Sequence, residues 1–215
     1  MALIISGLIS SFIAVSLVDE NTRLSLIKEN GPIEILSAIS YFIVPFIMLV
    51  KGGWKFLKRY NYLFILVSAL GLRELDFNAR FTTMSIWKIK FFLSTKVPFT
   101  EKIIGILVTL ILLYFLMSCL KKHWRSFLAG CTKEVVSMSI GISLFFMAIA
   151  FSLDRMPDKL INIGIGVTDH FPVISQSMEE IIELGIPLML IVATFAYFSK
   201  YPSGVDSVSF PERKK

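Results

Sequence analysis

The sequence predicts an all-α, polytopic membrane protein built as a bundle of six transmembrane helices. The first observation is composition: among 215 residues, 55% are hydrophobic, only 18% are charged and the mean hydropathy is +0.72. Soluble domains carry about 25% charged residues. The second observation is that the apolar residues gather in six blocks separated by charged segments. A helix needs about 20 mostly apolar residues to cross the hydrocarbon of a bilayer.

The six apolar blocks are predicted to be the transmembrane helices. They occupy residues 2–18, 34–50, 60–81, 102–120, 134–153 and 179–199. We expect helices because each backbone amide in lipid must be satisfied within its own segment. No positive charge precedes the first block, which therefore predicts a retained helix and not a cleaved signal peptide. The blocks form a single six-helix domain, residues 1–200, followed by a mobile basic cytoplasmic tail, residues 201–215.

The distribution of basic residues predicts the orientation. Segments 51–59, 121–133 and 200–215 each carry four or more Lys or Arg residues, taking Lys200 with the tail. Short basic segments stay in the cytoplasm, and alternation of six helices puts all three on one side. Both termini are then cytoplasmic. The predicted inner side has a net charge of +9 and the predicted outer side −3. The net charge of +6 therefore follows the membrane and is no sign of nucleic-acid binding.

The third block predicts the most informative polar group. Its purely apolar part, residues 62–72, is too short to cross the bilayer, so the helix is expected to continue to about Phe81. Helical spacing would then place Arg73, Asp76 and Arg80 on one face, and Glu74, Asn78 and Phe81 on the next. Ionisable side chains at that depth are expensive, and they are candidates for a functional site.

Other blocks bring further polar residues to the same predicted outer side. Glu34 begins the second block, and Ser37 and Tyr41 follow on its helical face. Glu180, Glu183 and Pro187 share one face of the sixth block, and Pro187 cannot donate a hydrogen bond to the carbonyl of Glu183. The expected cluster consists of Glu34, Arg73, Glu74, Asp76, Asn78, Asp169, His170, Glu180 and Glu183.

Three functions remain open for this cluster. In the first, the cluster is a structural ion-pair network in an accessory membrane protein. In the second, the carboxylates and His170 hold a divalent metal that activates water for the hydrolysis of a lipid or envelope substrate. In the third, the acids bind an ion or a proton in a small-solute transporter. The candidate metal ligands are Glu74, Asp76, His170 and Glu183.

The expected surroundings follow from the same observations. The layout resembles that of the membrane hydrolases grouped with alkaline ceramidases, whose metal site uses several histidines; here His170 is the one candidate on the predicted outer side. The expected partners are the lipid bilayer and either a membrane protein or a second copy of the chain, with no nucleic acid. The compact chain suggests a bacterial cytoplasmic (inner) membrane.

Overall fold

The computed structural model describes residues 1–27, 31–168 and 170–202, and every regular element in those ranges is a helix. The all-α prediction is confirmed for this part of the chain. The elements are α1 (Ala2–Leu17), α2 (Glu20–Ile27), α3 (Pro32–Arg59), α4 (Asn61–Glu74), the 3₁₀ helix η1 (Phe77–Arg80), α5 (Ile89–Leu93), α6 (Phe99–Gly130), α7 (Val135–Leu153), α8 (Met156–Asn162) and α9 (Phe171–Lys200).

Four helices of the described ranges, α3, α6, α7 and α9, are long and apolar enough to cross a membrane. Each of the six predicted blocks falls on a helix, but α1 has only 16 residues and α4 only 14. At about 1.5 Å per residue, α4 is about 21 Å long, less than the roughly 30 Å of bilayer hydrocarbon. Crossing by α1 and α4 and the cytoplasmic placement of the termini stay predictions.

The third block does not form one helix to Phe81, so that expectation is wrong. α4 ends at Glu74, and Asp76 adopts a left-handed conformation with φ of 42°. Aspartate tolerates this region better than most residues because its short side chain can bond locally. The amide of Asp76 donates to the carbonyl of Arg73 at 2.9 Å, which closes a turn before η1 begins. The two helical faces expected across residues 73–81 therefore do not exist.

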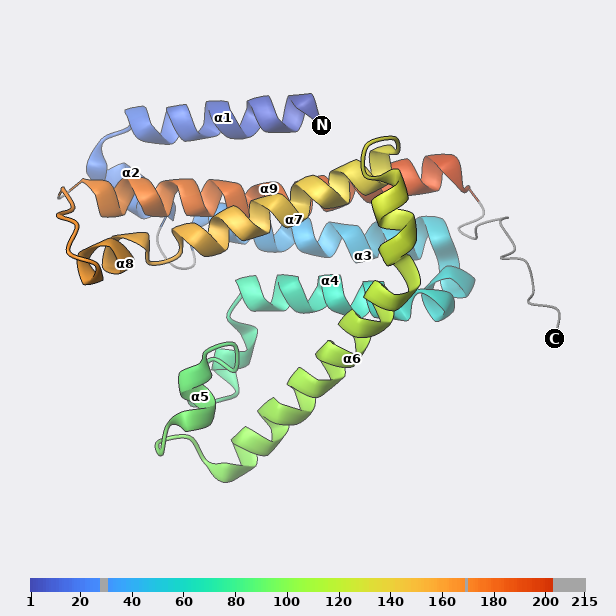
Figure 1. Ribbon diagram of the computed structural model, residues 1–215, viewed down its shortest axis with the longest axis horizontal. Helices are drawn as coiled ribbons and strands as arrows, with labels where there is room; N and C mark the ends of the chain where they lie inside the picture. Colours follow the sequence, from blue (N-terminus) through green and yellow to red (C-terminus); the bar gives the residue numbers. More distant parts are fainter. Residues whose placement is uncertain (28–30, 169, 203–215) are drawn as a thin grey trace.

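The centre of the fold is α9, which packs against α3, α7 and α1, while α4 packs against α3 (Figure 1). The core is made by α3, α4 and α9, and its largest buried side chains include Tyr41 of α3 and Met189 of α9. α6 contacts α4 and α7, but most of its length leaves the bundle on a diagonal (Figure 1).

The segment 51–59 belongs to α3, contrary to the expectation of a loop. The helix is kinked at Gly53, where φ is +62°. A side chain is strained at this φ, whereas glycine adopts it readily. At Gly52, a Cβ atom would lie 2.5 Å from the ring of Phe56. The glycine pair thus allows the last turn and a half of α3 to change direction and remain helical.

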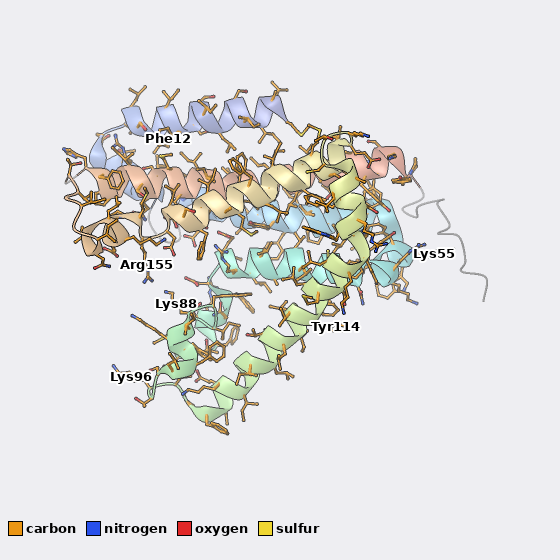
Figure 2. The ribbon with its side chains drawn as sticks, in the orientation of Figure 1. Phe12, Lys55, Lys88, Lys96, Tyr114 and Arg155 are labelled. Atoms are coloured by element: carbon orange, nitrogen blue, oxygen red, sulfur yellow. The ribbon has the colours of Figure 1, made fainter. Side chains whose placement is uncertain are left out.

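Two of the basic segments, 51–59 and 121–133, lie at one end of the bundle together with Lys200 (Figure 1). Lys55 lies at that end, whereas Arg155, Lys88 and Lys96 lie towards the other (Figure 2). The ammonium group of Lys200 at the end of α9 lies 2.8 Å from the carboxylate of Glu134, which begins α7. We call the end with Lys55, Lys200 and Glu134 the basic end; the residues Arg73 and Glu74 at the end of α4 lie away from it (Figure 1).

Candidate functional site

The end of α4 lies directly on α3 because Gly71 has no side chain. A Cβ atom at Gly71 would be 3.0 Å from the Cβ of Tyr41 and 3.2 Å from the ring of Phe42. This close approach places Arg73 and Glu74, the last two residues of α4, at the junction with α3 and α9. A glycine in the contact face of two apolar helices is the usual way to bring their backbones close.

Arg73 connects α4 to α9. Its Nη2 donates to Oε1 of Glu183 at 3.0 Å and lies 3.7 Å from Oε1 of Glu74. The side chain of Glu74 is only 6% exposed and that of Glu183 19%, whereas that of Arg73 is 40% exposed. One guanidinium group therefore serves two carboxylates that are largely withdrawn from the surroundings of the bundle.

More carboxylates surround this ion pair than the arginine can balance. Glu180 is within electrostatic range of Glu183, Glu34 and Glu74. Glu74 in turn interacts electrostatically with Glu34 and Asp76. We call Glu34, Arg73, Glu74, Glu180 and Glu183 the acid cluster. If Glu74, Glu180 and Glu183 were all ionised beside Arg73, these four side chains would carry a net charge of −2.

Buried hydroxyl groups lie beside the acid cluster. Tyr41 is 1% exposed and interacts electrostatically with Glu74, Arg73 and Glu183. Ser37, one turn before Tyr41 on the same face, is also 1% exposed. Within the described part of the chain its hydroxyl oxygen has no hydrogen-bond partner, and neither has that of Ser175 on α9. A buried hydroxyl is costly unless it is hydrogen-bonded, so polar groups at these positions add to the polar character of the interior of the bundle.

The proline in α9 adds a backbone acceptor at the same level. Pro187 is buried inside the helix and has no N–H group, so the carbonyl of Glu183 lacks its ordinary helical donor. One residue earlier, the carbonyl of Ile186 accepts a hydrogen bond from the hydroxyl of Ser143 on α7 at 3.3 Å. Glu183 thus combines a carboxylate bonded to Arg73 with a backbone carbonyl that has lost its helical donor.

The remaining predicted residues do not join the Arg73 ion pair. Asp76 lies in the exposed turn after α4, and Asn78 in η1 donates from Nδ2 to the hydroxyl of Ser85 at 3.1 Å. His170 precedes the first residue of α9. It is 13 positions before Glu183 along the helix axis, about 20 Å at about 1.5 Å per residue. Asp169 lies outside the described residues.

The proposed metal ligands are consequently not gathered. Across residues 1–27, 31–168 and 170–202, no group of three or more His, Cys, Asp and Glu side chains is arranged to hold a metal ion. Glu74 and Glu183 are held by Arg73, a cation that already occupies the space between their carboxylates. The donor set expected from the sequence does not fit a metal centre in this arrangement.

Tyr41 and Glu179 lie near the acid cluster but were not among the predicted site residues. Tyr41 was visible in the sequence only as a member of the Glu34 face. Glu179 on α9 interacts electrostatically with Glu183 and with Asp154 at the end of α7. The sequence does contain a signal for Glu179: it is adjacent to Glu180, and two neighbouring residues of a helix face different partners.

No family model matches the chain, and neither does any curated protein or solved structure.

Proposed function

We propose that this chain is a structural or accessory integral membrane protein whose acid cluster fastens α3, α4 and α9 together. The observation that supports the proposal is the hydrogen bond from Arg73 to Glu183, which joins residues 110 positions apart. We expect the protein to associate with another membrane protein or with a second copy of the chain, within a bacterial cytoplasmic membrane.

The physical argument concerns burial. A charged side chain in a low-dielectric setting is stable when it is paired, and removal of one partner leaves the other uncompensated. Glu74 and Glu183 are both shielded, and both lie beside the same guanidinium group. A matched pair at the basic end, Lys200 and Glu134, has both side chains 49% exposed. The two ion pairs therefore differ in burial, although each joins a basic side chain to a glutamate on another element.

A double-mutant cycle compares these pairs. The first cycle uses Arg73→Gln, Glu183→Gln and their double variant. The second uses Lys200→Gln, Glu134→Gln and their double variant. Each protein is unfolded by detergent titration. Allowing for the partial exposure of Arg73, we expect a coupling free energy of about 1–2 kcal/mol for Arg73 and Glu183. For the exposed pair we expect a clearly weaker coupling, because solvent screens it. Equal coupling in the two pairs would contradict the structural proposal.

A second candidate function is ion- or proton-coupled transport of a small solute, favoured by the surplus of carboxylates. One arginine cannot balance the three acids Glu74, Glu180 and Glu183, and ionisable groups in membrane helices often form ion or proton pathways. The carbonyl of Glu183, freed by Pro187, and the hydroxyl of Ser37 would supply further oxygen atoms to a cation. The metal-dependent hydrolase has no comparable support in the described part of the chain.

The variant Glu180→Gln separates these two candidates. It removes a carboxylate from the acid cluster and leaves the Arg73–Glu183 bond in place. In a purely structural cluster, the loss of like-charge repulsion makes the protein more stable in detergent. In a transporter, the same variant abolishes cation or proton flux into proteoliposomes, while Glu134→Gln leaves it intact. Absence of flux in the wild-type protein rejects the transport candidate.

A further inference from the structure

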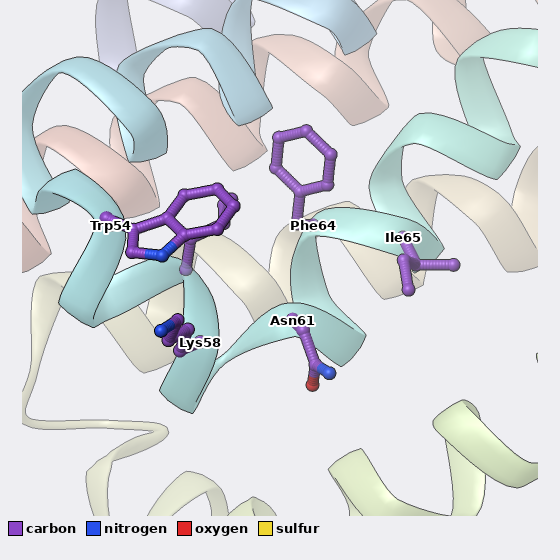
Figure 3. A pocket seen from close by; sticks show the side chains of 6 residues that line it. Trp54, Lys58, Asn61, Phe64 and Ile65 are labelled. Carbon is purple, nitrogen blue, oxygen red and sulfur yellow. The ribbon is translucent and has the colours of Figure 1, made fainter.

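A groove at the basic end of the bundle lies where α3 changes direction. It is formed between the segment of α3 after the Gly53 kink and the first turns of α4 (Figure 3). Its volume is about 340 Å³, within the range of small-molecule sites, about 300–1,000 Å³. The lining residues are Trp54, Leu57, Lys58, Asn61, Phe64 and Ile65.

The lining has an apolar part and a polar part. Leu57, Phe64 and Ile65 offer hydrocarbon and aromatic surface, whereas Lys58 and Asn61 are exposed and offer N–H donors. The Trp54 side chain is 65% exposed, and the Lys58 ammonium group lies 5.7 Å from the centre of its ring. Exposed tryptophan beside lysine is typical of the boundary between lipid headgroups and acyl chains.

The two helical segments that form the groove carry charges of one sign. Residues 51–59 include Lys51, Lys55, Lys58 and Arg59, and no acidic residue occurs from position 51 to position 73. The acid cluster is at the other end of α4. An occupant that places a negative charge beside Lys58 and an apolar chain along Phe64 therefore matches both parts of the lining.

We propose that this groove binds one anionic phospholipid from the surrounding bilayer. The phosphate accepts hydrogen bonds from Lys58 and Asn61, and one acyl chain lies along Leu57, Phe64 and Ile65. The glycine pair 52–53 creates the groove, because the kink turns the end of α3 towards the start of α4. The inference does not rest on the acid cluster or its proposed function.

Native mass spectrometry of the delipidated full chain in mild detergent tests the proposal. Phosphatidylglycerol and phosphatidylcholine with the same acyl chains are added in turn to the wild type, to Lys58→Gln and to Lys96→Gln. Lys96 is an exposed lysine far from the groove (Figure 2). We expect Lys58→Gln to weaken phosphatidylglycerol binding about fivefold, the effect of one basic residue near an anionic surface. Lys96→Gln should bind it like the wild type.

A second variant, Ile65→Trp, fills the apolar part of the groove and should reduce the binding of phosphatidylglycerol while Lys58 is still present. Millimolar inorganic phosphate should not displace the lipid, because phosphate alone has no chain to place along Phe64. Equal binding of the two lipids, or equal behaviour of Lys58→Gln and Lys96→Gln, would overturn the proposal. Displacement by inorganic phosphate would assign the site to a free anion instead.

Discussion

α9 and α6 are helices of nearly equal length, 30 and 32 residues, and the apolar stretch of α6 is the more hydrophobic of the two. Their surroundings are nevertheless opposite. Half of the most apolar stretch of α9 is buried against other helices, compared with 6% for α6. Hydropathy identifies both as candidate spans, but it does not tell which helix forms the centre of the fold.

The difference is explained by residue size. α9 buries small residues such as Ser177, Gly185 and Ala193, which let neighbouring helices approach closely. In residues 103–117 of α6, the only small residues are Gly105 and Thr109. Gly105 is used for a close contact with the ring of Phe91 in α5, not with the bundle. Since lipid is as apolar as leucine, large aliphatic residues alone give two helices little reason to associate.

The largest expected difference in stability comes from replacing a tyrosine by alanine in the core and, for comparison, on α6. Tyr41→Ala removes a ring that is 1% exposed in the core, and should destabilise the protein by about 3–5 kcal/mol. Tyr114→Ala removes a ring that is 69% exposed on α6 and should change the stability little. Detergent titration measures both free energies of unfolding, and Tyr41→Phe separates the ring from the hydroxyl. Similar losses in the two alanine variants would show that α6 is packed as tightly as the core.

A smaller effect is expected from filling the close contact of α9. At Gly185 a Cβ atom would lie 2.8 Å from Leu8 of α1 and from Phe146 of α7. Gly185→Leu should therefore destabilise the protein by about 1–3 kcal/mol through overpacking. Gly7 in α1 has no atom within 4 Å of such a Cβ, so Gly7→Leu is the matched control. Thermal unfolding in detergent should separate the two variants. If they melt together, α1 does not lie against α9.

The smallest effect concerns the attachment of α6. The hydroxyl of Tyr62 in α4 and Nε2 of His123 in α6 share a hydrogen bond of 2.6 Å. Tyr62→Phe should lower the free energy of unfolding by about 0.5–1.5 kcal/mol. It should also broaden the distances measured between spin labels on α4 and α6. Tyr114→Phe is the control. An unchanged distance distribution in Tyr62→Phe would mean that other contacts hold α6.

The sequence predicted the helical segments better than their packing. All six apolar blocks lie on helices because the demand for internal hydrogen bonds in lipid acts on each segment separately. The extension of the third block beyond Glu74 was wrong because the argument from helix length left out that Asp76 tolerates a left-handed conformation, which ends the helix here. The kink at Gly53 could be suspected from the glycine pair, but its direction depends on the contact with Phe56.

Five residues of the predicted polar cluster lie near one another in the structure. Glu34, Arg73, Glu74, Glu180 and Glu183 were expected at one level, and the structure brings them within electrostatic range. Helical periodicity fixes the height of a residue, but not the rotation of its helix about its axis. Nothing in the sequence therefore indicated that Arg73 would select Glu183 or that Tyr41 would lie against them. His170 was expected with the acids because the start of α9 was placed eight residues too late.

The 110 residues between Arg73 and Glu183 also affect how the protein is made. At about 5–20 residues per second, the ribosome needs roughly 5–20 s after Arg73 to produce its partner. During that interval Glu74, synthesised next to Arg73, is the one carboxylate of this ion pair that already exists. The bond between α4 and α9 can therefore form only after most of the chain has been made. Any folding intermediate before that point contains α3 and α4 but lacks the helix at the centre of the fold.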